Sequence, residues 1–131
     1  MRVFLILITL FLLTGCKSEA ELTLERGIQY YEWAVESNGS NVDKAVIEFK
    51  QVVRLLSTEL PNISRNDAVI LTKAHHNLAI CYLKKDWLDS AEQEARKAFK
   101  LMPTEANHTT LFVIKSEKKK KKKKLKDSVE Y

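Results

Sequence analysis

The chain has 131 residues but only three glycines and two prolines. Alternating runs of β-branched residues between turn signals, which are typical of strands, are also missing. With so few glycines, the sequence offers no glycine-rich loop that would cradle a phosphate. The composition therefore favours an all-α fold and disfavours a nucleotide-binding one.

Cysteine is equally scarce, with only Cys16 and Cys81 in the chain. Cys81 lies within the apolar stretch 78–82, so we expect it to be buried as a small apolar side chain. A reactive or metal-binding role is the weaker alternative for this thiol.

Catalytic motifs are absent from the sequence as well. It contains no His-Glu-x-x-His, Cys-x-x-Cys or Gly-x-Ser-x-Gly pattern. His75 and His76 are neighbours, and on a helix their rings would point about 100° apart, which is unsuitable for chelating one metal ion. We therefore expect no enzyme, no metal and no soluble cofactor.

The amino terminus carries the longest apolar run. Arg2 precedes an apolar stretch over 3–13, which is followed by Thr14, Gly15 and Cys16. As a helix this stretch would rise about 16 Å, about half of the hydrocarbon core of a bilayer. A positive start, a short apolar centre and small residues before a cleavage site are typical of a secretory signal peptide.

The segment Leu13-Thr14-Gly15-Cys16 resembles the lipobox of bacterial lipoproteins. The resemblance implies a signal peptide over 1–15, cleavage between Gly15 and Cys16, and a diacylglycerol on the Cys16 sulfur, whose thiolate is the nucleophile. Residues 16–20 would form a lipidated tether, and Cys81 would be left without a disulfide partner. An uncleaved membrane segment and an ordinary signal peptide with a chance cysteine are the alternatives.

Lys17 follows the cysteine, where many lipoproteins retained at the inner membrane have an acidic residue. The resemblance therefore favours the outer membrane of a bacterial cell envelope, on its periplasmic or its surface face.

The net charge of +5 is unevenly distributed along the chain. Residues 115–131 contain nine lysines and three acidic residues, whereas 17–114 contain 12 basic and 14 acidic residues. The sequence thus predicts a nearly neutral domain with a basic tail, and no nucleic-acid-binding body.

Apolar residues at helical spacing predict helices over 19–36, 42–57, 64–85 and 86–102. Turn signals separate them: Gly39 suits a positive φ, Ser40 or Asn41 is placed to cap the second helix, and Ser64-x-x-Asp67 resembles a capping box. The expected apolar faces are, for the first helix, Leu22, Leu24, Ile28, Tyr31 and Val35, and for the second, Val42, Ala45, Val46, Phe49, Val52, Val53 and Leu56.

The segment 72–105 resembles the tetratricopeptide repeat, which has 34 residues in two helices. The matching residues are His75, Leu78, Ala79, Tyr82, Ala91, Ala95, Ala98 and Pro103, although His75, Ala79 and Ala95 replace the usual Trp, Gly and large aromatic residue. In this pattern His75 occupies a packing position between helices. The resemblance implies antiparallel helical hairpins and closely packed helices.

An earlier segment matches the same repeat less well. Gly27-x-x-Tyr30 and Ala45-x-x-x-Phe49 resemble its two halves, but they are six residues too far apart. We therefore expect about one and a half to two repeats over 21–114. A C-terminal packing helix over 104–117, with Leu111, Phe112 and Ile114, would cover the exposed end of the stack.

In tetratricopeptide proteins the first helix of each pair lines a groove that accepts peptides. The resemblance implies a groove stripe, which we define as Lys73, His76, Asn77, Ile80 and Lys84. Its Lys and Asn donors would hold a carboxylate or a backbone carbonyl of a partner. A solvated helix face is the alternative.

The tail contains an uninterrupted lysine run: Lys118, Lys119, Lys120, Lys121, Lys122, Lys123 and Lys124. Mutual repulsion predicts disorder or at best a fraying extension of a helix. The run either contacts anionic lipids or acidic envelope polymers, or it is a tail without a function. Export would remove nucleic acid as a partner.

These patterns together predict a lipid-anchored envelope protein whose helical domain binds a protein or peptide partner. The alternative is a surface-displayed, adhesin-like lipoprotein that binds acidic host or matrix polymers through its lysine run.

Overall fold

The computed structural model describes residues 16–37 and 42–129. Within these ranges the chain forms five helices and no strand: α2 (Glu19–Glu36), α3 (Asp43–Ser57), α4 (Arg65–Lys84), α5 (Leu88–Leu101) and α6 (Glu105–Val129). The predicted all-α class is confirmed. The expected signal peptide and the turn residues Gly39, Ser40 and Asn41 lie outside the described residues.

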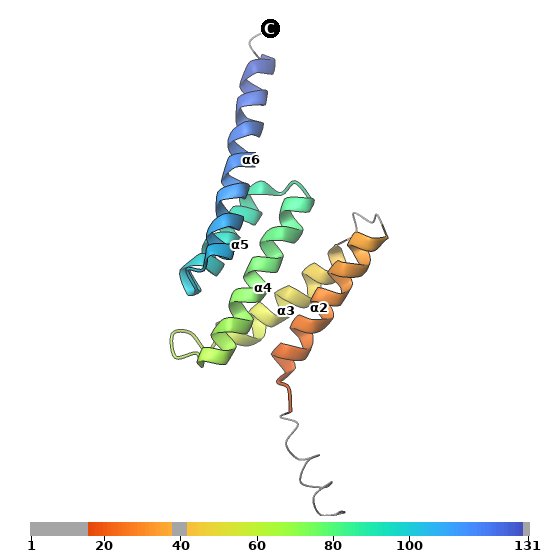
Figure 1. Cartoon of the computed structure of the whole chain (residues 1–131), viewed down its shortest axis with the longest axis vertical. Helices are drawn as coiled ribbons and strands as arrows, with labels where there is room; N and C mark the ends of the chain where they lie inside the picture. The colour runs from red at the N-terminus through yellow and green to blue at the C-terminus, as the bar shows by residue number, and fades with distance from the viewer. Residues whose placement is uncertain (1–15, 38–41, 130–131) are drawn as a thin grey trace, which may run out of the picture.

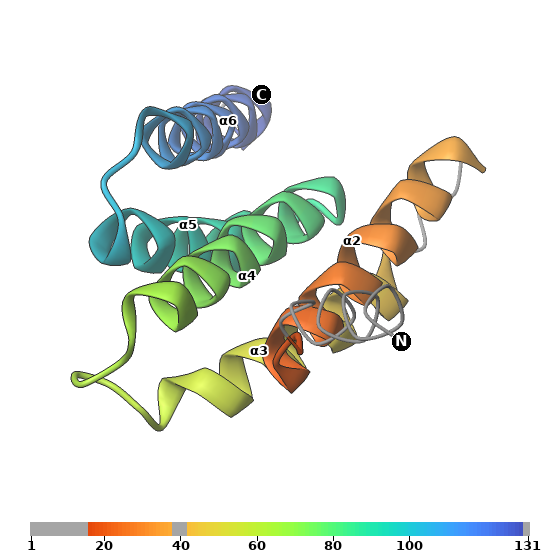
Figure 2. The ribbon, with the colours of Figure 1, turned by 60° about the horizontal axis from the view of Figure 1, so that its bottom comes forward.

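The helices pair as two hairpins, α2 with α3 and α4 with α5, followed by α6 (Figure 1). α4 is the central element, since it packs on each of the other four helices. α6 packs on α5 and α4 only. In Figure 2, α4 accordingly lies between α2 on one side and α6 on the other.

The side chain of Ser18 caps α2 by accepting a hydrogen bond from the Glu21 backbone N–H at 3.2 Å. The buried face of this helix consists mostly of small residues: Ala20, Thr23, Leu24, Gly27 and Ala34. The expectation that Leu22 and Val35 belong to the packing face is wrong, because they are 46% and 45% exposed. Leu22 lies two residues after Ala20, which turns it about 200° around the helix, away from α3.

The contact between α2 and α3 depends on Gly27. A Cβ atom at this position would lie 2.6 Å from Cε1 of Phe49, whose side chain is fully buried. α3 buries the face that its sequence predicts, with Val42, Ala45, Val46, Phe49, Val52 and Leu56 buried and Val53 half-buried. The Phe49 ring on α3 thus occupies the space that a side chain at position 27 of α2 would fill.

α4 begins as predicted. The Ser64 hydroxyl oxygen accepts a hydrogen bond from the Asp67 backbone N–H at 3.1 Å, and its O–H donates to the Asp67 carboxylate at 2.6 Å. Serine and aspartate therefore satisfy each other at the helix start, in a variant of the capping box.

The expectation that Asp86 starts the fourth helix is wrong. Asp86 adopts a left-handed conformation with φ 58°, and α5 begins only at Leu88. The N–H of Trp87 donates to the Tyr82 carbonyl and that of Asp86 to the Leu83 carbonyl, the bonding of a Schellman motif. The rings of Tyr82 and Trp87 pack at 5.8 Å across the motif. Asp86 therefore ends α4, a role that aspartate fills because it tolerates positive φ better than most residues.

Small residues bring α4 and α5 together. Ala79 on α4 and Ala91, Ala95 and Ala98 on α5 are all at most 1% exposed. Cys81 is fully buried on α4, as its apolar neighbours predict.

α6 docks through its first half. Leu111 and Ile114 are buried, but Phe112 is 66% exposed, so the expectation that Phe112 packs inward is wrong. It follows Leu111 by one residue and so points about 100° away from the buried face. The second half of α6 extends past the body of the molecule (Figure 1).

We predict that Gly27→Ala lowers the free energy of unfolding by about 1–3 kcal/mol. Helix propensity alone would raise the stability, because alanine favours helices by about 1 kcal/mol over glycine. A lower free energy of unfolding would therefore be due to the clash with Phe49. Urea unfolding followed by circular dichroism measures it, with the exposed Gln29→Ala as control. An unchanged or raised stability would contradict the close contact.

Candidate functional site

The predicted attachment residue, Cys16, is exposed and lies next to the folded body. Only Lys17 and Ser18 separate it from the first residue of α2. The expected tether over 16–20 therefore overlaps the helix, where Ala20 is already buried. Gly15 and the rest of the lipobox lie outside the described residues. Among the residues that the structure describes, no helix combines the length and apolar character needed to cross a membrane.

The groove stripe lies along α4 and is partly covered by its neighbours. Lys73 and Lys84 are exposed, whereas His76, Asn77 and Ile80 are half-buried. α4 itself lies between α2 and α6 (Figure 2).

Two residues of the stripe already have intramolecular partners. His76 lies with Nδ1 2.9 Å from Oδ1 of Asn107 on α6, and Lys84 Nζ lies 5.8 Å from the centre of the Tyr31 ring on α2. Asn107 also donates through Nδ2 to the Met102 carbonyl at 2.8 Å. His76 thus helps to position α6, which leaves Lys73, Asn77 and Ile80 as the more available part of the stripe.

His75 occupies a buried packing position between α4 and α5. Its Nδ1 lies 2.5 Å from the carboxylate of Glu94, which Lys97 also contacts at 2.8 Å. Burial acts to raise the pKa of Glu94, but the hydrogen bonds from His75 and Lys97 outweigh it and lower that pKa below its ordinary value. The expected packing role of His75 is confirmed.

The described residues hold little for nucleophilic or metal chemistry. Burial raises the pKa of the Cys81 thiol to about 12, which keeps it protonated and unreactive. Within 16–37 and 42–129, no group of three or more His, Cys, Asp or Glu side chains is placed to hold a metal ion.

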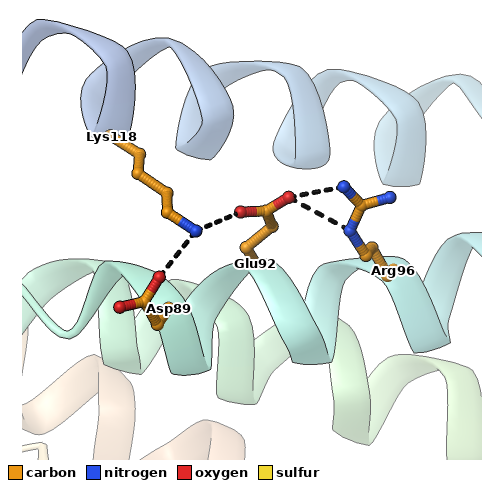
Figure 3. A network of polar contacts seen from close by, with 4 residues as sticks. All are labelled: Asp89, Glu92, Arg96 and Lys118. Atoms are coloured by element: carbon orange, nitrogen blue, oxygen red, sulfur yellow. Dashed lines mark hydrogen bonds and ion pairs between the residues drawn. The ribbon is translucent and has the colours of Figure 1, made fainter. Parts of the chain in front are cut away.

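The lysine run is a helical continuation of α6, so the expectation of disorder is wrong and the expected alternative, an extension of a helix, is what the structure shows. Lys118 bridges α6 to α5, with Nζ 2.6 Å from the Asp89 carboxylate and 2.7 Å from that of Glu92 (Figure 3). Lys121 pairs with Asp86, and Lys120 with Glu117 on the same helix. These pairs offset part of the mutual repulsion, and lysine has a high intrinsic helix propensity.

Asp86, Asp89 and Glu92 form what we call the acidic strip beneath α6. Hydrogen bonds from Lys118 lower the pKa values of Asp89 and Glu92, and the same bonds raise the pKa of Lys118. Arg96 braces Glu92 from the other side at 2.6 Å (Figure 3). Sequence reasoning missed this strip, although its spacing of three residues opposite a cationic run was a usable signal.

The strip divides the lysine run into two faces. Lys118 and Lys121 contact the acidic strip, whereas Lys119, Lys120, Lys122 and Lys123 share an exposed surface with Lys126. The outward face thus keeps its positive charge available to a partner. Comparisons with protein-family models, with curated proteins and with solved structures find no match to this chain.

We predict that Glu94→Gln lowers the free energy of unfolding at neutral pH by about 1–3 kcal/mol. Because the folded pKa of Glu94 is below its ordinary value of 4.5, its carboxylate stabilises the fold above that pH. This contribution is lost as the pH falls from 4.5 through the folded value, so the stability of the variant should vary less with pH there. Denaturant titrations at several pH values measure this dependence. If the free energy of unfolding changed equally with pH in wild type and variant, the prediction would be refuted. Glu105→Gln, at an exposed position, is the control.

We predict that Lys118→Met loosens the second half of α6 by removing the bridge to the acidic strip. Amide exchange of 118–129 should accelerate roughly threefold to tenfold, and added salt should produce part of the same effect in the wild type. The matched control is Lys119→Met, which removes an exposed lysine that has no ion pair within the described residues. Equal acceleration in both variants would show that the bridge is unimportant.

Proposed function

We propose that this protein is a lipid-anchored bacterial envelope protein whose helical body is an interaction module. The observation that carries the proposal is the position of Cys16, an exposed cysteine that follows an apolar segment with a lipobox pattern and precedes a capped helix. Because Cys16 is exposed, its sulfur is accessible for acylation. Two or three acyl chains, at about 0.8 kcal/mol per buried methylene, would hold the protein on a membrane durably.

The short segment before α2, residues 16–18, would keep the body close to the membrane. Cys16 lies three positions before the first residue of α2, which corresponds to about 10 Å of extended chain. The membrane would therefore limit how the body is oriented, and its remaining faces would be presented to the surrounding compartment.

Exposed apolar side chains on the body support a binding role. Large apolar side chains are exposed on three helices, among them Leu22 and Trp33 on α2, Ile47 on α3 and Phe112 on α6. Single exposed apolar residues are ordinary, but those that line a surface hollow indicate contact with a partner. The helical hairpins, similar to tetratricopeptide repeats, would supply a rigid frame for such contacts.

A second candidate function is adhesion to acidic polymers. It is supported by the exposed lysine face of α6, which lies at the opposite end of the molecule from the start of α2 (Figure 1). In an anchored protein this face would point outward, where it could meet an acidic polymer of the envelope or of a host.

We predict that Cys16→Ser abolishes labelling by a clickable fatty acid in bacterial cells and moves the protein from the membrane fraction to the soluble one. Mass spectrometry of the mature N-terminus checks the modification. Cys81→Ala is the control, because a buried thiol should not affect labelling. Label that persists in Cys16→Ser would refute the anchor.

If the anchor is confirmed, protease treatment of intact cells separates the two functions. Cleavage of the protein supports adhesion, and protection supports a periplasmic module.

A further inference from the structure

Two surface hollows lie at opposite ends of the helical stack. The first is on α2, the helix at one end, and is lined by Leu22, Glu25, Arg26, Ile28, Gln29 and Glu32. Its centre is apolar, and Leu22 is 46% exposed. Leu22, Glu25, Gln29 and Glu32 lie on the side of α2 opposite Gly27, while Arg26 reaches Glu48 on α3 at 2.9 Å.

The second hollow is at the other end, between α5 and α6. It is lined by Arg96, Phe99, His108, Leu111, Phe112 and Lys115. Phe112 is 66% exposed there, the most exposed aromatic ring of the described residues. This hollow is also apolar at its centre, but cations stand at its edge.

The edges of the two hollows carry opposite charges. Glu25, Arg26 and Glu32 border the first, whereas Arg96 and Lys115 border the second. Three of these charges are already in ion pairs: Glu25 with Lys17, Arg26 with Glu48 and Arg96 with Glu92. Within the described residues no ion pair involves Glu32 or Lys115, so their charges are available. The two end helices differ in charge in the same sense: α2 has five glutamates and one arginine, while α6 continues into the lysine run.

We propose that the partner of this module is a second copy of the chain, with α2 of one molecule packed into the α5/α6 hollow of the next. α4 packs on both α2 and α6, and within the described residues no further helix packs on α2 beyond α3 and α4, or on α6 beyond α5 and α4. A second copy would continue the stack and bury both apolar centres, as neighbouring repeats do within a chain. The inference rests on the proposed role as an interaction module, but it does not require the lipid.

The contact joins two different surfaces, so it does not close into a simple dimer. After the first contact the pair keeps one free hollow of each kind, one on each molecule, and an open row of molecules follows. α2, α4 and α6 all start on the same side of the molecule (Figure 1). A row built along the stack would therefore keep every Cys16 on one side, compatible with a single membrane. Attachment to that membrane would raise the local concentration and favour the row.

The test places a photo-cross-linking phenylalanine analogue at position 112 of the full-length chain in bacterial membranes. The expected result is a ladder of dimers and larger species, with the cross-linked peptide from α2. Monomer only, cross-links to α6 of another copy, or cross-links only to a different protein would overturn the proposal. The same experiment on a Cys16→Ser chain separates the two proposals, because self-association should survive in concentrated extract even where anchoring has failed.

Charge reversal tests the pairing of the two edges. Glu32→Lys alone and Lys115→Glu alone should each reduce the dimer yield about three- to tenfold, by placing like charges together. Co-expression of the two variants should restore the yield, because a reversed α2 then meets a reversed α6. Failure of the mixture to recover would contradict the head-to-tail contact. Glu59→Lys and Arg65→Glu, at exposed positions outside both hollows, are the matched controls.

Discussion

Close contact between helices at positions occupied by glycine or alanine is the constraint on which the rest of this structure depends. Gly27 admits the Phe49 ring between α2 and α3, and the alanines of α5 let it lie directly on α4. A body of this size has a modest core, so its apolar side chains must be shared among several helices. α4 meets this requirement by packing on all four of the others.

Polar contacts add to the apolar core in fixing the position of α6. Asn107 connects the start of this helix to the Met102 carbonyl and to His76, and Lys118 holds its middle on the acidic strip. Between these points Leu111 and Ile114 supply the apolar contact. From 119 to 129 every residue is exposed, so the docked first half of α6 sets the direction of its last turns.

Much of the fold was predictable because its signals are local. The bounds of α2, the cap at Ser64 and the buried face of α3 each follow from a few neighbouring residues. Features that depend on distant partners were not predictable in the same way. The helical state of the lysine run depends on carboxylates about 30 residues earlier in the chain, and the half-covered groove stripe depends on Asn107 reaching His76 from α6. Asp86 is a third case, because its role as a helix end became clear only from the Schellman hydrogen bonds. The candidate attachment site was fully local, whereas the two hollows required the folded arrangement of α2, α5 and α6.

The three residues from Cys16 to Ser18 have a consequence for turnover. Proteases cleave where several consecutive residues can be drawn out into an extended conformation. The described chain ahead of α2 offers only this short stretch, and Ser18 is already engaged as the helix cap. An anchored molecule would therefore resist being shed from its membrane by a single cut at this lead. Its lifetime on the membrane would instead be governed by how often the first turns of α2 unwind.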